Sequence, residues 1–194
     1  QRVEWEPILA EAIALGYESL MLDGSRLPLD ENIAATRQAV LLARPAGLPV
    51  EGELGAVLGH EAGPLPPYEE LFRSGKGFTD PEEAARFVRE SGVAWLSVAI
   101  GNIHGAIQGA ARNAKKIEAR LNIEHLETLR RAVNIPLVLH GGSGIARECL
   151  RKAIAHGIAK INVGTALRQA YEEGLRTSVS EAQRRVRETT EMII

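Results

Sequence analysis

Five short apolar segments, each followed by a polar or glycine-rich turn and then by a segment of helical periodicity, constrain the fold of this sequence most. Because apolar and β-branched residues dominate these segments, we predict strands at 18–22, 49–54, 94–100, 136–140 and 159–163. The longer periodic segments predict helices near 6–15, 30–44, 80–91, 123–133, 145–156 and 166–188. Strands that alternate with helices in this way are typical of an α/β protein with a parallel sheet.

The composition of the sequence excludes some classes of partner and indicates the cell compartment. The 194 residues suffice for one sizeable core or for part of a larger domain, and 23 basic and 25 acidic residues give a formal net charge of −2. This balance argues against a nucleic acid or an anionic membrane as the main partner, and no apolar run approaches the length of a membrane span. The single cysteine, Cys149, excludes an internal disulfide and fits a reducing compartment. We therefore expect a soluble, cytoplasmic protein.

Polar side chains stand at the carboxyl ends of the predicted strands, and in a parallel sheet these ends share one face. His104 and His140 each follow a strand and precede a glycine, while Asp23 and Glu53 end two other strands. A single histidine at a strand end is more often structural or solvated, but two imidazoles and two carboxylates on neighbouring strands favour a metal site. Imidazole suits zinc. The other histidines fit less well because they lie in a loop or on helices: His60, His125 and His156.

Glu53 differs from an ordinary acidic turn residue because it lies within the apolar alternation of its strand. Glu51 comes two residues earlier, so both side chains belong to the same face of the strand. Carboxylates inside a sheet need a cation or a hydrogen-bond donor. This pair therefore strengthens the prediction of a cation at the strand ends.

Glycine-rich turns end the last two predicted strands, with the sequences "HGGSG" and "NVGT". Glycine lets the backbone approach an oxyanion closely, Ser143 and Thr165 add hydroxyl donors, and a helix that begins near Ile145 offers its N-terminus. One such turn is weak support, because tight turns need glycine for their own geometry. Two of them in consecutive strand–helix units predict a phosphate site.

One connection, residues 56–78, is longer than the others. It contains glycine and proline, shows no clear period, and is predicted to be a mobile lid or binding loop. Gly59, His60 and Glu61 near its start carry polar groups that could close over a ligand.

These motifs together resemble the class II, zinc-dependent aldolase family, which includes the fructose-bisphosphate and tagatose-bisphosphate aldolases of bacteria. The resemblance rests on several motifs in the order of the family: "SLMLDGSRLPLDENI", "PVEGELG", "FTDPEEAARFV", "VAIGNIHG", "IPLVLHGGSG" and "KINVGTALR". It implies a TIM (β/α)8 barrel of which strands four to eight are present here. Residues 1–194 would then form a single, partial barrel domain.

The resemblance also implies roles for individual residues. His104 and His140 correspond to two of the three histidines that hold the catalytic zinc, while Asp23 and Glu53 correspond to acidic residues that can hold a displaced or second divalent or monovalent ion. Glu61 corresponds to an acidic lid residue implicated in proton transfer. The segments that hold the dihydroxyacetone-phosphate moiety correspond to Gly105, Gly141, Gly142, Ser143, Asn162, Val163, Gly164 and Thr165.

The function implied is the reversible aldol cleavage of a ketose phosphate or bisphosphate to dihydroxyacetone phosphate and an aldehyde, with zinc as the cofactor. A sugar phosphate would be the partner, and a homodimer or homotetramer the assembly. The third zinc histidine and the acid/base aspartate of the family lie in an H-L-D-H motif that is absent here, so we expect a preceding segment that the sequence does not contain. Two alternatives stay open: a metal-dependent sugar-phosphate isomerase or epimerase, and a non-catalytic homologue or fragment.

Overall fold

The computed structural model describes residues 4–57, 67–103 and 119–194. Within them lies one parallel sheet in which each strand pairs with the next strand along the chain. Its five strands are β1 (Leu20–Leu22), β2 (Val50–Leu54), β3 (Trp95–Val98), β4 (Leu137–Leu139) and β5 (Ile158–Ile161). All five predicted strands are therefore confirmed. Parallel strands in chain order are the arrangement of consecutive strands in a (β/α)8 barrel.

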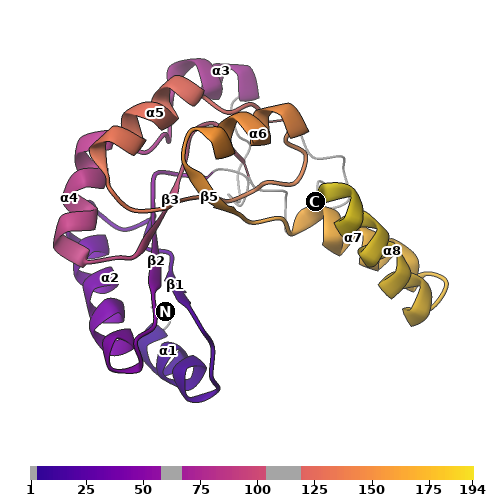
Figure 1. The fold of residues 1–194 in the computed structure, drawn as a ribbon, viewed down its shortest axis with the longest axis horizontal. Coiled ribbons are helices and arrows are strands. Elements are labelled where there is room, and N and C mark those ends of the chain that lie inside the picture. The colour runs from indigo at the N-terminus through magenta and orange to yellow at the C-terminus, as the bar shows by residue number, and fades with distance from the viewer. Residues whose placement is uncertain (1–3, 58–66, 104–118) are drawn as a thin grey trace.

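Helices connect the strands and cover the outer face of the sheet, as Figure 1 shows. They are α1 (Trp5–Ala14), α2 (Leu29–Ala43) with the short 3-10 helix η1 (Arg44–Ala46), α4 (Pro81–Ser91), α5 (Ile123–Ala132) and α6 (Arg147–Ala155). The start of α4 is typical of how the sequence sets these boundaries. The Asp80 carboxylate accepts hydrogen bonds from the backbone N–H groups of Glu82 and Glu83, and Pro81 occupies the first helical position.

Apolar packing lies between the sheet and these helices. Leu96 and Leu137 are fully buried in the same cluster as Phe87 of α4. Gly52 of β2 permits this packing, because a Cβ atom at that position would lie 2.8 Å from the Phe87 ring. Successive side chains of a strand point to opposite faces. The residues on either side of Gly52 therefore point to the inner face of the sheet, where the polar side chains gather.

The single helix predicted at 166–188 is wrong. The structure has two helices, α7 (Thr165–Leu175) and α8 (Val179–Ile193), which form a hairpin that extends away from the sheet (Figure 1). Ser178 begins the second helix because its hydroxyl accepts a hydrogen bond from the backbone N–H of Glu181. At Gly174 a Cβ atom would lie 2.4 Å from the Cα atom of Ala182. Glycine at this position thus lets the two helices touch along their backbones.

The predicted loop at 56–78 also needs correction, because part of it is helical. Helix α3 (Tyr68–Ser74) lies within it, whereas residues 58–66 lie outside the described residues. The helix has ordinary boundary signals: Pro67 precedes it, and Gly75 ends it in the left-handed conformation at φ 65°. These signals were present in the sequence, but a seven-residue helix is too short to show a period.

Candidate active site

Two glutamates and a histidine meet on the inner face of the sheet. Glu51 and Glu53 of β2 are only 1% and 3% exposed, and His140, which follows β4, is 7% exposed. The Nε2 atom of His140 lies 2.8 Å from Oε1 of Glu51, and its Nδ1 atom lies 3.3 Å from Oε2 of Glu53. Lys160 of β5 completes the group, with Nζ 2.5 Å from Oε2 of Glu51. We call these four residues the inner cluster.

The two carboxylates of the inner cluster have opposite electrostatic environments. Burial works to raise the pKa of Glu51, but hydrogen bonds and charge from His140 and Lys160 outweigh it, so that the pKa is lowered. For Glu53, burial and the negative charge of Asp23 raise the pKa to about 7. Glu51 is therefore an ionised partner of two donors, whereas for Glu53 the charge influence of His140, which lowers the pKa, is outweighed by burial and by Asp23.

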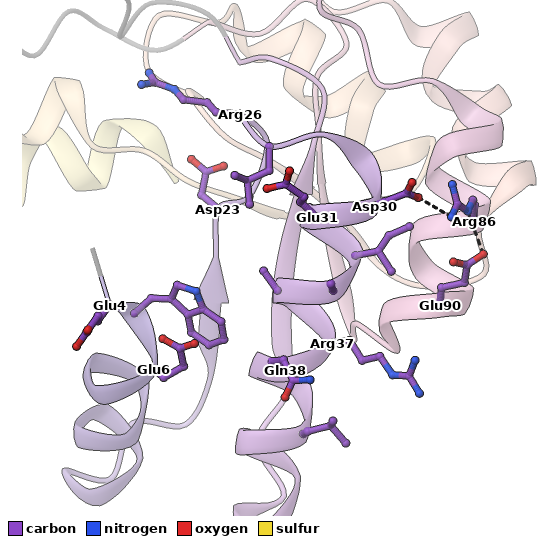
Figure 2. Close-up of a pocket in the computed structure, with 17 residues that line it drawn as sticks. Glu4, Glu6, Asp23, Arg26, Asp30, Glu31, Arg37, Gln38, Arg86 and Glu90 are labelled. Carbon is purple, nitrogen blue, oxygen red and sulfur yellow. Dashed lines mark hydrogen bonds and ion pairs between the residues drawn. The ribbon is translucent and has the colours of Figure 1, made fainter. Parts of the chain in front are cut away.

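Asp23 lies at the end of β1, exposed at the rim formed by the carboxyl ends of the strands. Its Oδ1 atom accepts hydrogen bonds from the backbone N–H and the hydroxyl of Ser25, at 3.0 and 2.6 Å. Asp23 also lines an open cleft of about 1220 Å³ that runs from the start of α1 along α2 (Figure 2). Glu53 and His140 do not line this cleft. Asp23 thus both lines this cleft and influences the charge of Glu53.

The two glycine-rich turns after β4 and β5 are joined to each other. The backbone N–H of Ala166, in the first turn of α7, donates to the Ser143 hydroxyl at 3.1 Å. The backbone N–H of Gly142 donates to the carbonyl of Asn162 at 2.9 Å, and a Cβ atom at Gly142 would lie 2.6 Å from Ile161. The glycine at 142 therefore serves the contact between the turns. Ser143 stands beside the N-terminus of α7, which is the environment that an anion prefers.

Asn102 connects the ends of β3 and β4, a role that the sequence analysis missed. Its side-chain amide is 3% exposed, donates to the carbonyl oxygens of His140 and Val98 at 3.1 and 3.3 Å, and accepts from the backbone N–H of Ile100 at 2.8 Å. It thereby fixes the backbone of His140. Asn102 lies two residues before His104, in a turn that was considered only for its histidine. Its place in that turn was the signal that the sequence offered.

Asn32 and Thr79 are two further buried residues that fix strand ends and were missed. The Asn32 side chain donates to the backbone carbonyl of Glu53 at 2.9 Å. The Thr79 hydroxyl donates to the carbonyl of Leu54 at 2.6 Å and accepts from the backbone N–H of Ala99 at 2.8 Å. Asn32 lies near the start of α2 and Thr79 lies just before α4, so in the sequence both look like ordinary residues of a helix boundary. Only the fold brings them to the end of β2.

The other predicted site residues are placed as follows. Asn162 continues directly from β5, and its backbone N–H donates to the carbonyl of Leu139 at 2.9 Å. Gly141 has a φ of 68° and begins the turn after His140. The remaining residues of the second turn lead into α7: Val163, Gly164 and Thr165. The residues outside the described ranges are Glu61, His104 and Gly105.

The donor atoms of the inner cluster fit one part of a metal site. A histidine that binds a metal usually gives its other ring N–H to a carboxylate, and Glu51 accepts from Nε2 of His140 in this way. On the other side of the ring, the 3.3 Å between Nδ1 and Oε2 of Glu53 is close to the spacing of about 3.4 Å that two ligands of a tetrahedral zinc ion have. Within the described residues no three His, Cys, Asp or Glu side chains form a complete site. These residues supply the donors that zinc accepts, but only some of its ligands.

Comparisons with known proteins identify relatives of this chain. The chain is 38% identical over 173 residues to a 6-phospho-5-dehydro-2-deoxy-D-gluconate aldolase of Halalkalibacterium halodurans, covering 89% of this chain and 54% of that protein. It is 40% identical over 167 residues to a fructose-bisphosphate aldolase of Streptococcus pyogenes, covering 86% of this chain and 52% of that one. The chain thus spans about half the length of these curated relatives.

A solved structure shows the same similarity in three dimensions. The YdjI aldolase of Escherichia coli superimposes with a TM-score of 0.71 at 36% identity, over 94% of this chain and 60% of that one. The family model described as "Fructose-bisphosphate aldolase class-II" matches residues 5–193, which is nearly the whole sequence. The predicted fold class and the predicted resemblance are both confirmed. This chain belongs to the class-II fructose-bisphosphate aldolase family.

Proposed function

We propose that the protein is a metal-dependent aldolase that reversibly cleaves a ketose phosphate or bisphosphate into dihydroxyacetone phosphate and an aldehyde such as glyceraldehyde 3-phosphate. The observation that carries this proposal is the convergence of the inner cluster and the Ser143 turn on the carboxyl ends of adjacent strands, β4 and β5. Aldol cleavage of a phosphorylated ketose needs charge stabilisation and a phosphate grip side by side.

In this proposal, zinc is held by His140 together with His104, and Asp23 and Glu53 take a second divalent or monovalent ion. Bound zinc would supply Lewis-acid stabilisation of the negative charge that develops on the substrate carbonyl oxygen. The raised pKa of Glu53 supports a cation in this position, because a positive charge would relieve the unfavourable burial of its carboxylate. His140 is prepared for binding by its hydrogen bond to Glu51.

The phosphate grip would come from the joined turns after β4 and β5. Ser143 and the N-terminal N–H groups of α7 would hold the phosphate and so orient the ketose. Gly105, Gly141, Gly142 and the residues of the second turn complete this proposed grip: Asn162, Val163, Gly164 and Thr165. Residues 56–78 would act as a lid of the single domain, with Glu61 moving a proton.

Lys160 argues against a Schiff-base mechanism at this sheet. A Schiff-base lysine must lose its proton to attack a carbonyl carbon. The Nζ atom of Lys160 is instead engaged by Oε2 of Glu51 at 2.5 Å, so it is not a free amine that faces a substrate carbonyl. Carbonyl activation by a metal ion is therefore the better account of this site.

The name of a relative does not decide which ketose is cleaved. One relative is a fructose-bisphosphate aldolase and another is a 6-phospho-5-dehydro-2-deoxy-D-gluconate aldolase. Both names describe phosphorylated ligands, which agrees with the proposed grip. We propose a phosphorylated ketose as the substrate class, and a cleavage assay with fructose bisphosphate, tagatose bisphosphate and the deoxygluconate phosphate would rank the candidates.

We further propose a cytoplasmic homodimer or homotetramer. Within the described ranges, no helix combines the length and the apolar character needed to cross a membrane. The α7–α8 hairpin exposes large apolar side chains, which supports self-association: Tyr171, Leu175, Val179 and Met192. Sedimentation analysis of the natural full-length protein would test this assembly, since a monomer at micromolar concentration would contradict it.

The first test of the function is His140→Ala in the natural full-length chain. We expect zinc content, measured by elemental analysis, and aldol cleavage to be lost together. His156→Ala is the matched control, because His156 ends α6 and pairs with Glu127 at 3.1 Å, on another element from the inner cluster. Unchanged zinc content in His140→Ala would remove the metal assignment.

A second test addresses the phosphate grip. Ser143→Leu should weaken the binding of inorganic phosphate and of phosphorylated ligands, while zinc content stays near that of the wild type. Equal losses of phosphate binding and zinc would indicate that the turn is only structural, and would contradict its proposed role.

A further inference from the structure

A β-bulge determines where Lys160 points. Leu137 of β4 pairs with Ile158 of β5, but the next residue, Val138, pairs with Lys160, so that Ala159 is an extra residue in β5. Because paired residues of parallel strands point to the same side of a sheet, this insertion places Lys160 on the inner face. Bulges occur next to active sites, where they redirect a side chain.

The redirected lysine is the first member of a chain of charged contacts. Its ammonium lies 2.5 Å from Oε2 of Glu51 and 5.5 Å from the centre of the Trp95 ring, which faces the same side. The other carboxylate oxygen of Glu51 accepts from Nε2 of His140 at 2.8 Å. Lys160 of β5 and Glu51 of β2 thus form a continuous path that ends at the ring of His140, the residue that follows β4.

This path determines which nitrogen of His140 can bind a metal. An ionised carboxylate is only an acceptor, so the proton of the imidazole is held on Nε2 by Glu51. The ring then directs Nδ1 towards Glu53, which is 3.3 Å away. Loss of the ammonium would leave a carboxylate that is 1% exposed with His140 as its remaining partner, and the orientation of the ring would weaken.

We propose that Lys160 and Glu51 are positioning residues that fix the ring and the tautomer of His140, so that its Nδ1 atom, on the side of Glu53, receives the metal ion. This inference rests on the proposed function, since it assumes that His140 is a metal ligand. It goes further by naming the binding nitrogen and by giving two residues outside the metal coordination a definite task. Partners of metal ligands typically change metal affinity by about 10–100-fold when they are replaced.

The test uses the natural full-length protein labelled with 15N-histidine, together with zinc titrations against a competing chelator. In wild-type protein, long-range 1H–15N spectra should show Nε2 of His140 protonated in the metal-free and the zinc-loaded forms, with the zinc-dependent shift on Nδ1. Glu51→Gln should raise the zinc Kd by about 10–100-fold, and Lys160→Met by about 10-fold. Lys160→Arg keeps the charge and should restore most of the affinity.

The matched control is Lys152→Met, because Lys152 also forms an ion pair, with Glu148 at 2.8 Å, but lies on the exposed side of α6. Its zinc Kd should equal that of the wild type. If Glu51→Gln does not fold, Lys160→Met and Lys160→Arg still carry the test, since the Lys160 side chain is 42% exposed. Far-UV circular dichroism would establish that each variant is folded.

The outcomes separate this inference from the proposed function. If His140→Ala binds zinc as well as the wild type does, the proposed function fails. If His140→Ala loses zinc but Lys160→Met keeps both the wild-type Kd and the wild-type 15N shifts, only the inference is overturned. A zinc-dependent shift on Nε2 would overturn it as well.

Discussion

Glu51 and Glu53 stand two residues apart on the same face of β2, yet their surroundings differ in almost every respect. Glu51 lies deeper along the strand, between Lys160 and His140, and its pKa is lowered. Glu53 lies at the rim near Asp23, and its pKa is raised to about 7. Both side chains are almost fully buried, at 1% and 3% exposure. Equal burial therefore leads to opposite protonation behaviour.

This difference shows where the charges on the inner face of the sheet are balanced within the protein and where a bound ligand would balance them. Around Glu51, the inner cluster already contains the positive charge that a buried carboxylate needs, on Lys160. The rim contains an excess of negative charge, which a bound cation would balance. Carboxylates whose environments separate their pKa values often have different roles in one site. We assign Glu51 to positioning and Glu53 to cation binding.

The largest effect should come from removing the charge of each carboxylate in turn. In metal-free protein at pH 8, Glu51→Gln should lower the free energy of unfolding by about 2–3 kcal/mol, because Lys160 and His140 lose an ionised partner. Glu53→Gln should raise it by about 2 kcal/mol, because an unfavourable buried charge disappears. Urea unfolding in the presence of a chelator measures both. If the two variants shift stability in the same direction, the contrast between the two sites is wrong.

The pH dependence of stability should show a similar contrast. In the folded protein the pKa of Glu53 is about 7, against an ordinary value of 4.5. The stability that its bound proton provides is therefore fully present below pH 4.5 and is lost as the pH rises through about 7. The loss amounts to about 3 kcal/mol. Glu51 has a lowered pKa, so its contribution is present above pH 4.5 and is lost as the pH falls below that value.

Chemical denaturation of metal-free protein between pH 3 and pH 9 would check this profile. Glu53→Gln serves as the control. It should remove the loss of stability between pH 4.5 and 7, while the loss of stability below pH 4.5, which comes from Glu51, should remain. Saturating zinc should also flatten the alkaline limb, since a cation keeps Glu53 ionised at lower pH. An alkaline limb that is identical in wild type and Glu53→Gln would contradict the assignment.

The common face of the two carboxylates and their nearness to His140 could be predicted from the sequence, whereas the contrast between them could not. The period of two in "VEGEL" places Glu51 and Glu53 on one face, and parallel strands bring His140 to the same rim. Both expectations follow from local rules, and the structure bears them out with contacts of 2.8 and 3.3 Å from the ring of His140. The class of fold follows from the same alternation of strands and helices.

Other features depend on pairings that no local rule contains. Strict alternation along β5 would put Ile158 and Lys160 on one face, whereas the bulge turns Lys160 inward and leaves Ile158 in the apolar core. The break between α7 and α8 depends on the close approach of Gly174 to Ala182. The role of Asn102 depends on the backbone of a strand 38 residues later in the sequence. These three features therefore depend on long-range contacts, which the local sequence pattern does not contain.

A smaller effect is expected when Lys160 is replaced, since this change makes Glu51 resemble Glu53. Lys160→Met removes hydrogen-bond and charge contributions that lower the pKa of Glu51, so this pKa should rise. The free energy of unfolding at pH 7 should fall by about 1–2 kcal/mol, less than for the loss of the carboxylate, because Lys160 is partly solvated. Urea unfolding at pH 7 measures the loss, with Lys152→Met as control. A stability equal to that of the wild type would mean that His140 alone keeps Glu51 ionised.

The smallest effect concerns the neighbours of the two carboxylates across β3. Trp95 lies opposite Glu51, and Ser97 lies opposite Glu53. The Ser97 hydroxyl is fully buried and makes no hydrogen bond of good geometry within the described residues. Its contact with Glu53 is the weakest of the influences on the pKa of that carboxyl, which it lowers. Ser97→Ala in metal-free protein should therefore change the free energy of unfolding by less than about 1 kcal/mol, because only this weak contact with Glu53 is lost.

Ser91 is the matched control for this last prediction, since it is also buried but donates to the carbonyl of Phe87 at 2.6 Å. Ser91→Ala should lower the free energy of unfolding by about 1 kcal/mol, clearly more than Ser97→Ala. If Ser97→Ala costs as much as Ser91→Ala, the hydroxyl supports the Glu53 carboxyl in the metal-free protein. The rim would then be held in place as firmly as the part of the inner cluster around Glu51, and the difference between Glu51 and Glu53 would be one of charge alone.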